Sequence, residues 1–224
     1  MPPYHVGFLL WPGLTQLDMT GPAQVLSRMP GAVLHFVWKS LEPVPSDCGL
    51  SLLPTATLEN CPQLQLLCVP GGAPVVPVMR DARVLAWLQQ QAAGAEWVTS
   101  VCTGSLILAA AGLLEGYRAG CHWSSGQLLE RFGATFVAER VVFDRNRITA
   151  GGVTSGIDFA FRVIERLHGR DMAEAVQLAL EYDPAPLAGG TPQTARPEIL
   201  AQVQASMAAR VAERERQAAA IARA

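Results

Sequence analysis

The stretch from Trp97 to Leu114 constrains the fold of this chain more than any other. It opens as a short apolar run that ends at Val101, turns at Cys102-Thr103-Gly104, and continues as a segment rich in Leu and Ala. A strand that stops abruptly and feeds a helix leaves its junction residue in a tight, often strained turn, which is the geometry of a nucleophile elbow. The sequence therefore predicts a strand–turn–helix unit with Cys102 at the junction.

Cys102 in such a turn would stand over the amino end of a helix. That end carries unpaired N–H groups and a partial positive charge of roughly half a unit. Both favour an anion, so we expect the pKa of the Cys102 thiol to be lowered and part of it to be thiolate. The alternative is that Cys102 is a small buried hydrophobic residue, as many free cysteines are.

Apolar runs of strand length alternate with helical patterns over most of the chain. Strands are expected at residues 5–11, 33–38, 64–69 and 97–101, and helices at 20–28, 82–93 and 157–167. This alternation predicts an α/β fold, a mostly parallel sheet with helices on both faces. Ligand sites in such folds lie beyond the carboxyl ends of the strands.

Three turns would meet at that edge of the sheet. One follows the first strand and carries Asp18, the second is Pro70-Gly71-Gly72, and the third holds Cys102. The backbone N–H groups of Gly71 and Gly72 can face a developing negative charge, as in an oxyanion hole. The alternatives are an ordinary turn at the two glycines and a helix-terminal charge at Asp18.

Composition narrows the functional classes. Half of the 224 residues are hydrophobic and the net charge is −2, which does not favour a nucleic-acid or membrane-surface partner. No signal peptide or transmembrane span is expected, and the protein is placed in the cytoplasm. Dinucleotide and P-loop motifs are missing, so no cofactor is expected. Neither a zinc site nor a disulfide framework is expected from five scattered cysteines without CxxC spacing: Cys48, Cys61, Cys68, Cys102 and Cys121.

The last part of the chain differs from the rest. Residues 186–224 are expected to form an extended connection followed by an amphipathic helix from about Pro197. Ile199, Val203, Met207 and Val211 recur every four residues and give that helix one narrow apolar stripe. We expect the stripe to pack on the same domain or on a partner subunit.

Five motifs together carry a family resemblance. They are Leu17-Asp18-Met-Thr-Gly-Pro22, Pro70-Gly-Gly72, Ser100-Val-Cys102-Thr-Gly104, His122-Trp123, and Thr149 to Asp158. In this order they resemble the DJ-1/PfpI superfamily, and within it the isonitrile (isocyanide) hydratases. The resemblance runs from about residue 6 to about residue 183.

The resemblance implies a flavodoxin-like α/β sandwich, usually homodimeric, with residues 1–185 as a domain of the class I glutamine amidotransferase type. Cys102 then matches the elbow nucleophile, and Asp18 the acidic residue beside it. Thr103 stands where protease-like members carry a His, which disfavours a Cys-His-acid triad. His122 matches a His near the cysteine, or is structural beside Trp123.

The implied activity is that of a hydro-lyase acting on a small molecule. A thiolate at Cys102 would attack the terminal carbon of an isonitrile to give a thioimidate. Asp18, kept protonated by burial and by the neighbouring thiolate, would act as general acid and then as base for the water that releases an N-substituted formamide. Thr103 and the amides of Gly71 and Gly72 would hold the intermediate, with Gly151 as an accessory position.

Other functions fit the same motifs. One is a DJ-1-like redox or stress protein in which Cys102 is oxidised to a sulfinate. A second is a non-catalytic ligand-binding module related to the sensing half of AraC-type regulators. A third is a glyoxalase- or amidase-like hydrolase. The single C-terminal helix is too little for a helix-turn-helix domain, so binding to nucleic acid is not expected.

Overall fold

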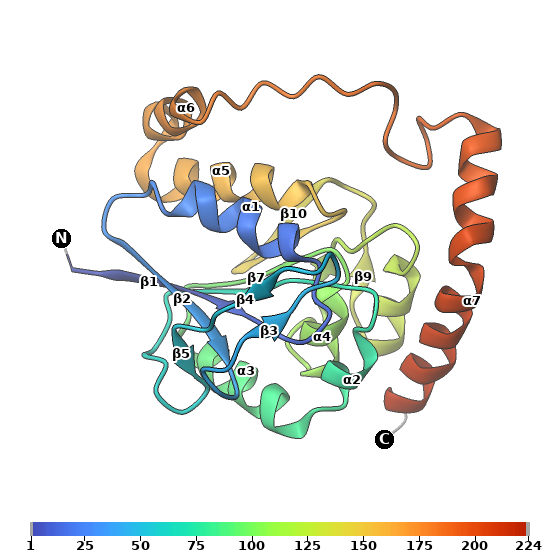
Figure 1. Cartoon of the computed structure of the whole chain (residues 1–224), viewed down its shortest axis with the longest axis horizontal. Coiled ribbons are helices and arrows are strands. Elements are labelled where there is room, and N and C mark those ends of the chain that lie inside the picture. Colours follow the sequence, from blue (N-terminus) through green and yellow to red (C-terminus); the bar gives the residue numbers. More distant parts are fainter. Residues whose placement is uncertain (1, 223–224) are drawn as a thin grey trace.

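A seven-stranded sheet forms the centre of the computed structural model, which describes residues 2–222 (Figure 1). The strand order is β10-β11-β7-β6-β1-β2-β5, and all neighbours are parallel except β10, which runs antiparallel to β11. The strands are β1 Tyr4–Leu9, β2 Ala32–Trp38, β5 Ala56–Thr57, β6 Leu66–Val69, β7 Trp97–Val101, β10 Val141–Asp144 and β11 Arg147–Ala150. The expected mostly parallel α/β sandwich is confirmed.

Helices cover both faces of the sheet (Figure 1). One layer contains α1 Gln16–Leu26, α5 Ser155–His168 and α6 Arg170–Ala179, and the other contains α2 Val76–Met79, α3 Ala82–Gly94 and α4 Gly104–Ala110. Short elements complete the domain: the pair β3 Val44–Pro45 and β4 Ser51–Leu52, the pair β8 Arg118–Ala119 and β9 Thr135–Phe136, and the 3-10 helix η1 Gly126–Phe132.

Strands β6 and β7 lie in the middle of the sheet and carry the core. Every residue of both strands is buried, and β6 is apolar throughout. β7 also carries the buried Thr99 and Ser100, whose hydroxyls bond to the Leu67 carbonyl and to the Ser105 hydroxyl. Such strands give a rigid sheet edge on which the following loops can be positioned.

Helix α1 differs from the sequence expectation. It begins at Gln16, about four residues before the expected start, so that Asp18 lies in its first turn and Pro22 inside it. A proline in a helix cannot donate to the carbonyl four residues earlier, here that of Asp18. Tertiary packing favours the longer helix, because Gly21 and Pro22 lie against Ile157 and Gly156 of α5.

The elbow depends on a close backbone contact. A Cβ built on Gly104, the first residue of α4, would lie 2.0 Å from the carbonyl oxygen of Val69 at the end of β6. Only glycine allows α4 to start this close to the neighbouring strand. The helix then ends at Ala110.

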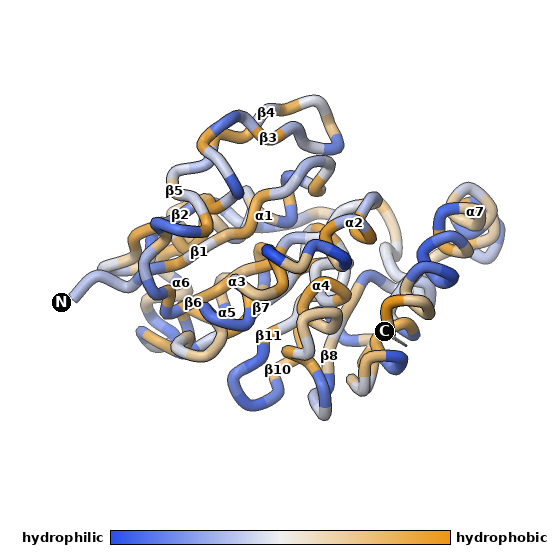
Figure 2. Tube along the Cα trace, turned by 90° about the horizontal axis from the view of Figure 1, so that it is seen from below, coloured by the Kyte–Doolittle hydropathy of each residue, from blue (hydrophilic) through white to orange (hydrophobic). Residues whose placement is uncertain are grey.

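Helix α7, Pro197–Ile221, stands at one side of the domain (Figure 1 and Figure 2). A connection without helix or strand leads to it from α6. The second half of α7 packs against α2 and η1, with Arg214 and Ala218 buried, whereas Ile199 and Val203 in its first half are exposed. Within residues 2–222, no helix is both long enough and apolar enough to cross a bilayer.

We expect Gly104→Ala to destabilise the protein by about 1–3 kcal/mol or more, because the added methyl group would overlap the Val69 carbonyl and backbone cannot move aside cheaply. Urea unfolding measures the change. Gly190→Ala is the matched control, since no atom lies within 4 Å of its Cβ position. If the two variants were equally stable, the close approach of Gly104 to the Val69 carbonyl would not constrain the fold.

Candidate active site

Cys102 occupies the turn between β7 and α4 and has a left-handed backbone, with φ of 60°. This conformation costs a residue with a side chain about 1–2 kcal/mol. The turn is held by the Cys102 N–H, which donates to the Ala150 carbonyl at 3.0 Å. The thiol is buried apart from a small exposed fraction of 6%.

Asp18 brings a carboxyl group to this thiol. Its side chain is fully buried, and Oδ2 accepts the Gly71 N–H at 2.8 Å, while Oδ1 has no hydrogen-bond partner among residues 2–222. Burial raises the pKa of Asp18 to about 7; the Gly71 amide and the Cys102 thiol act in the opposite direction, and Asp47 adds to the rise. Asp18 is therefore a group that exchanges a proton near neutral pH.

The expectation of a lowered pKa at Cys102 is wrong for this resting site. Burial, the Asp18 carboxylate and the nearby Cys121 raise the pKa of the Cys102 thiol well above its usual value, and the Thr103 contacts lower it only in part. The start of α4 does favour an anion, but the thiol is desolvated and faces a second acidic group. A thiol, rather than a thiolate, thus stands beside Asp18 at rest.

Gly71 and Gly72 do not present bare amides to the site, which corrects the oxyanion-hole expectation. The Gly71 N–H is taken by Asp18, and the Gly72 N–H donates to Thr103 Oγ1 at 2.9 Å. Thr103 Oγ1 in turn donates to the Gly72 carbonyl at 2.9 Å. Both glycines therefore position side chains of the site, and a Cβ on Gly71 would lie 2.5 Å from the Thr103 nitrogen.

A cavity of about 200 Å³ opens in front of Cys102. Three segments of the chain form its walls: the loops after the strands, the His122 region and helix α7. The lining residues are Thr15, Asp47, Gly72, Ala73, Cys102, Thr103, His122, Ser124, Val153, Met207, Arg210 and Arg214. Of the sequence candidates, Asp18, Gly71 and Gly151 lie outside this lining. Asp18 and Gly71 lie behind it, bonded to each other, and Gly151 is buried with its N–H donating to the Arg140 carbonyl at 3.0 Å.

Helix α7 supplies cavity residues that the sequence analysis did not select. Met207, Arg210 and Arg214 all belong to it. A signal was present, because the apolar stripe through Met207 and Val211 continues at helical spacing to Arg214 and Ala218. The helical spacing therefore placed one charged residue, Arg214, on the face of α7 that is buried.

His122 lies in the cavity wall, but its hydrogen bond leads away from the thiol. Nδ1 is 2.8 Å from Ser124 Oγ, and burial together with the Arg214 charge lowers the pKa of the imidazole. A neutral His bonded to a serine does not form a Cys-His-acid triad. Among the sequence candidates, Cys102 and Asp18 remain the thiol and the carboxyl that lie next to each other.

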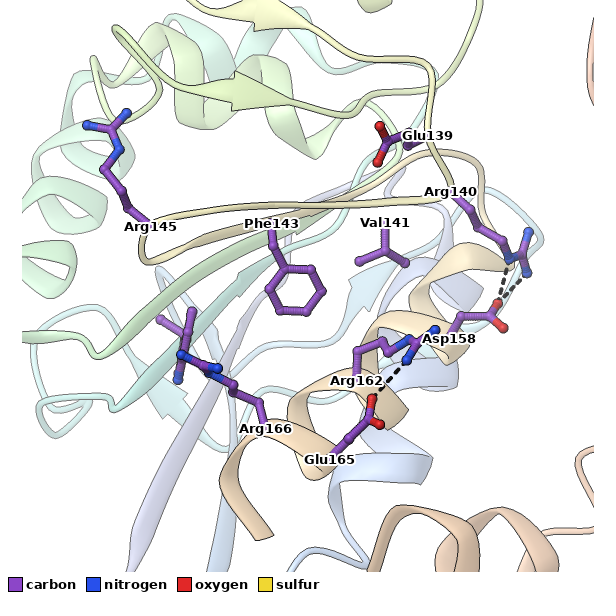
Figure 3. A pocket seen from close by; sticks show the side chains of 10 residues that line it. Glu139, Arg140, Val141, Phe143, Arg145, Asp158, Arg162, Glu165 and Arg166 are labelled. Carbon is purple, nitrogen blue, oxygen red and sulfur yellow. Dashed lines mark hydrogen bonds and ion pairs between the residues drawn. The ribbon is translucent and has the colours of Figure 1, made fainter. Parts of the chain in front are cut away.

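A larger cavity of about 1050 Å³ lies elsewhere, between β10 and α5 (Figure 3). It contains no cysteine, and several of its charges pair with each other: Arg140 with Asp158, and Arg162 with Glu165 at 2.8 Å. This cavity is larger than the one at Cys102, but no thiol lines it. Residues 2–222 hold no cluster of three or more His, Cys, Asp or Glu side chains suited to a metal ion.

The raised pKa of Asp18 predicts how stability depends on pH. In the folded protein the Asp18 carboxyl keeps its proton up to about pH 7, whereas in the unfolded chain it releases that proton above about pH 4. The free energy of unfolding of the wild type should therefore fall between about pH 4 and 7 and then level off. Asp18→Asn lacks this titration, and its stability relative to wild type should rise by up to about 4 kcal/mol over that range. Chemical unfolding at pH 4.5, 6 and 8 tests this; a constant difference would contradict it. Glu42→Gln, which removes an exposed carboxyl outside the cavity lining, is the control.

Comparisons with known proteins agree with this geometry. The DJ-1/PfpI family matches residues 4–166. An isonitrile hydratase from Pseudomonas putida is 54% identical over 85% of this chain and 84% of its own length. The regulator GbdR of Pseudomonas aeruginosa is 31% identical over 81% of this chain, which spans about half of the regulator.

Solved structures give the same result. A ThiJ/PfpI family protein from Pseudomonas syringae has a TM-score of 0.93 and 42% identity over 99% of this chain and 91% of its own. DJ-1beta of Drosophila melanogaster shares the fold with a TM-score of 0.74 and 22% identity over 81% of this chain and 100% of its own. The chain belongs to the DJ-1/PfpI family.

Proposed function

We propose that this protein adds water to an isonitrile to give an N-substituted formamide, with Cys102 as nucleophile and Asp18 as general acid and base. The observation that carries the proposal is the pair itself: a thiol on a strained elbow beside a buried carboxyl whose pKa is about 7. The similarity to an isonitrile hydratase over most of both chains supports the substrate class.

The first step forms a thioimidate. Because the Cys102 thiol has a raised pKa, Asp18 in its carboxylate form removes the thiol proton as the sulfur attacks the terminal isonitrile carbon. The S–C bond forms, and Asp18 delivers the same proton to that carbon. The product is Cys102–S–CH=N–R, and Asp18 is a carboxylate again.

The second step consumes one water. Asp18 takes a proton from the water as the water oxygen adds to the thioimidate carbon, and it passes this proton to the nitrogen. When the C–S bond breaks, the new hydroxyl oxygen becomes the formamide carbonyl and gives its proton to Asp18, which returns it to the Cys102 sulfur. Thr103 keeps the elbow in place, since its hydroxyl bonds to the Gly72 backbone.

The shape of the site suits this chemistry. A cavity of about 200 Å³ accepts a small substrate, and the buried carboxyl keeps its proton-transfer role because bulk water does not reach it. An isonitrile has no acidic proton, so one carboxyl that both takes and returns a proton is sufficient.

We expect Cys102→Ala to lower the rate of formamide formation from cyclohexyl isocyanide at least about 1000-fold, because no other group can form the covalent intermediate. Asp18→Asn should lower kcat by about 100- to 10,000-fold, since the amide cannot exchange the proton. The rates are measured side by side on purified proteins.

Cys48→Ala is the matched control, as Cys48 is an exposed cysteine outside the cavity lining. Its rate should equal that of wild type. Full activity in Cys102→Ala, or an unchanged rate in Asp18→Asn, would refute the mechanism.

The covalent intermediate should be visible by mass. When Asp18→Asn or wild-type enzyme is quenched within one turnover, the peptide that contains Cys102 should gain the full mass of the isonitrile, because addition of the thiol loses no atoms. Peptides that contain Cys61, Cys68 or Cys121 should remain unmodified. Turnover with no adduct at any time point would favour direct attack by water instead.

A further inference from the structure

Arg214 is a buried cation without an acidic partner. It lies in the second half of α7, and only 5% of its surface is exposed. Among residues 2–222, no carboxylate lies within ion-pair distance of it, although nearby Arg216 on the same helix pairs with Glu213. Burying a guanidinium without an anion is costly, so an uncompensated charge at this position points to an electrostatic role.

The hydrogen bonds of Arg214 are made to neutral acceptors. Nη1 donates to Ser125 Oγ at 2.6 Å and Nη2 donates to the Ala73 carbonyl at 2.9 Å. Nε is buried and has no partner among the described residues. Two fixed ends of the guanidinium therefore set its position, and its charge remains uncompensated.

The charge is held in the wall of the cavity that contains Cys102. Ala73 follows Gly72 in the loop beside the elbow, and both residues line this cavity together with Arg214. Burial lowers the pKa of Arg214, and the thiols of Cys121 and Cys102 oppose that shift. The acidic groups that interact most directly with this cation are thus cysteine sulfurs.

Other charged groups face Cys102 from the surrounding elements. Asp18 of α1 and the Cys121 thiol raise the pKa of Cys102 and so disfavour a negative sulfur. Asp47 and Arg210 line the same cavity but are exposed to solvent, which screens their charges, and His122 is mainly neutral because its pKa is lowered. Arg214 is the buried positive charge in this set.

We propose that Arg214 is a positioning residue for the hydration reaction: its fixed, unpaired guanidinium stabilises the negative charge that develops on the Cys102 sulfur when the thiol proton leaves. Helix α7 is then part of the active site rather than an appendage. The inference rests on the proposed function, in which the Cys102 sulfur is the attacking group.

The test measures the reactivity of Cys102 without an isonitrile. Alkylation by iodoacetamide is followed from pH 6 to 10 by mass spectrometry of the Cys102 peptide, with exposed Cys48 as internal reference. In Arg214→Gln the Cys102 rate at pH 8 should fall about tenfold and its pH profile should move upward, because the thiolate has lost its stabilising charge. The kcat for cyclohexyl isocyanide should fall by a similar factor, with KM little changed.

Two variants separate charge from structure. Arg214→Lys keeps the charge and should stay within about threefold of wild type. Arg216→Gln removes a charge from the exposed side of the same helix and should leave the alkylation profile and kcat as they are. An unchanged profile in Arg214→Gln, or a loss in Arg214→Lys as large as in Arg214→Gln, would overturn the proposal.

A second measurement does not depend on the folding of an Arg214 variant. In protein labelled with ¹⁵N, the Arg214 Nε–H resonance should titrate together with Cys102 in wild type and stay constant with pH in Cys102→Ser. A flat wild-type resonance across the range in which Cys102 becomes reactive would overturn the proposal.

The outcomes also separate this inference from the proposed function. If Arg214→Gln slows alkylation but wild type turns over no isonitrile, the electrostatic role stands and the assigned reaction fails. If isonitrile turnover depends on Cys102 but is insensitive to Arg214→Gln, the reaction stands and the role of Arg214 fails.

Discussion

The contact between the first residue of α4 and the end of β6 is the constraint on which the site depends. Gly104 approaches the Val69 carbonyl so closely that no side chain fits, and α4 therefore begins directly at the carboxyl edge of the sheet. Too little chain remains for a relaxed turn, so Cys102 adopts a left-handed backbone. The strain is sustained by two fully buried strands, β6 and β7.

The carboxyl edge of the sheet also determines the environment of Asp18. The loops after β1 and β6 are joined by Trp11 Nε1, which donates to the Pro70 carbonyl at 3.1 Å, and by the Thr15 N–H, which donates to the Gly71 carbonyl at 2.9 Å. These two bonds hold the first turn of α1, which contains Asp18, in the interior. A carboxyl held there by a single amide bond has a raised pKa and can exchange a proton near neutrality.

The Cys102 thiol and the Asp18 carboxyl share one buried environment. Because the pKa values of both groups are raised, neither is permanently ionised at neutral pH, and in the proposed reaction a proton passes between them. Arg214 lies in the wall of the cavity that contains Cys102, and in our proposal its fixed positive charge favours the sulfur when the sulfur is negative.

The sequence by itself determined the strand–turn–helix unit around Cys102 and the parallel α/β fold, because apolar periodicity and glycine placement are local properties of the chain. The expectation that Asp18 lies beside Cys102 came from that topology and from the family resemblance. Tertiary structure decided the direction of the pKa shift at Cys102, the engagement of the Gly71 and Gly72 amides and the place of Arg214 in the cavity. These properties depend on burial and on contacts between residues 31 to 141 positions apart, and desolvation is a property of the packed fold that no local pattern records.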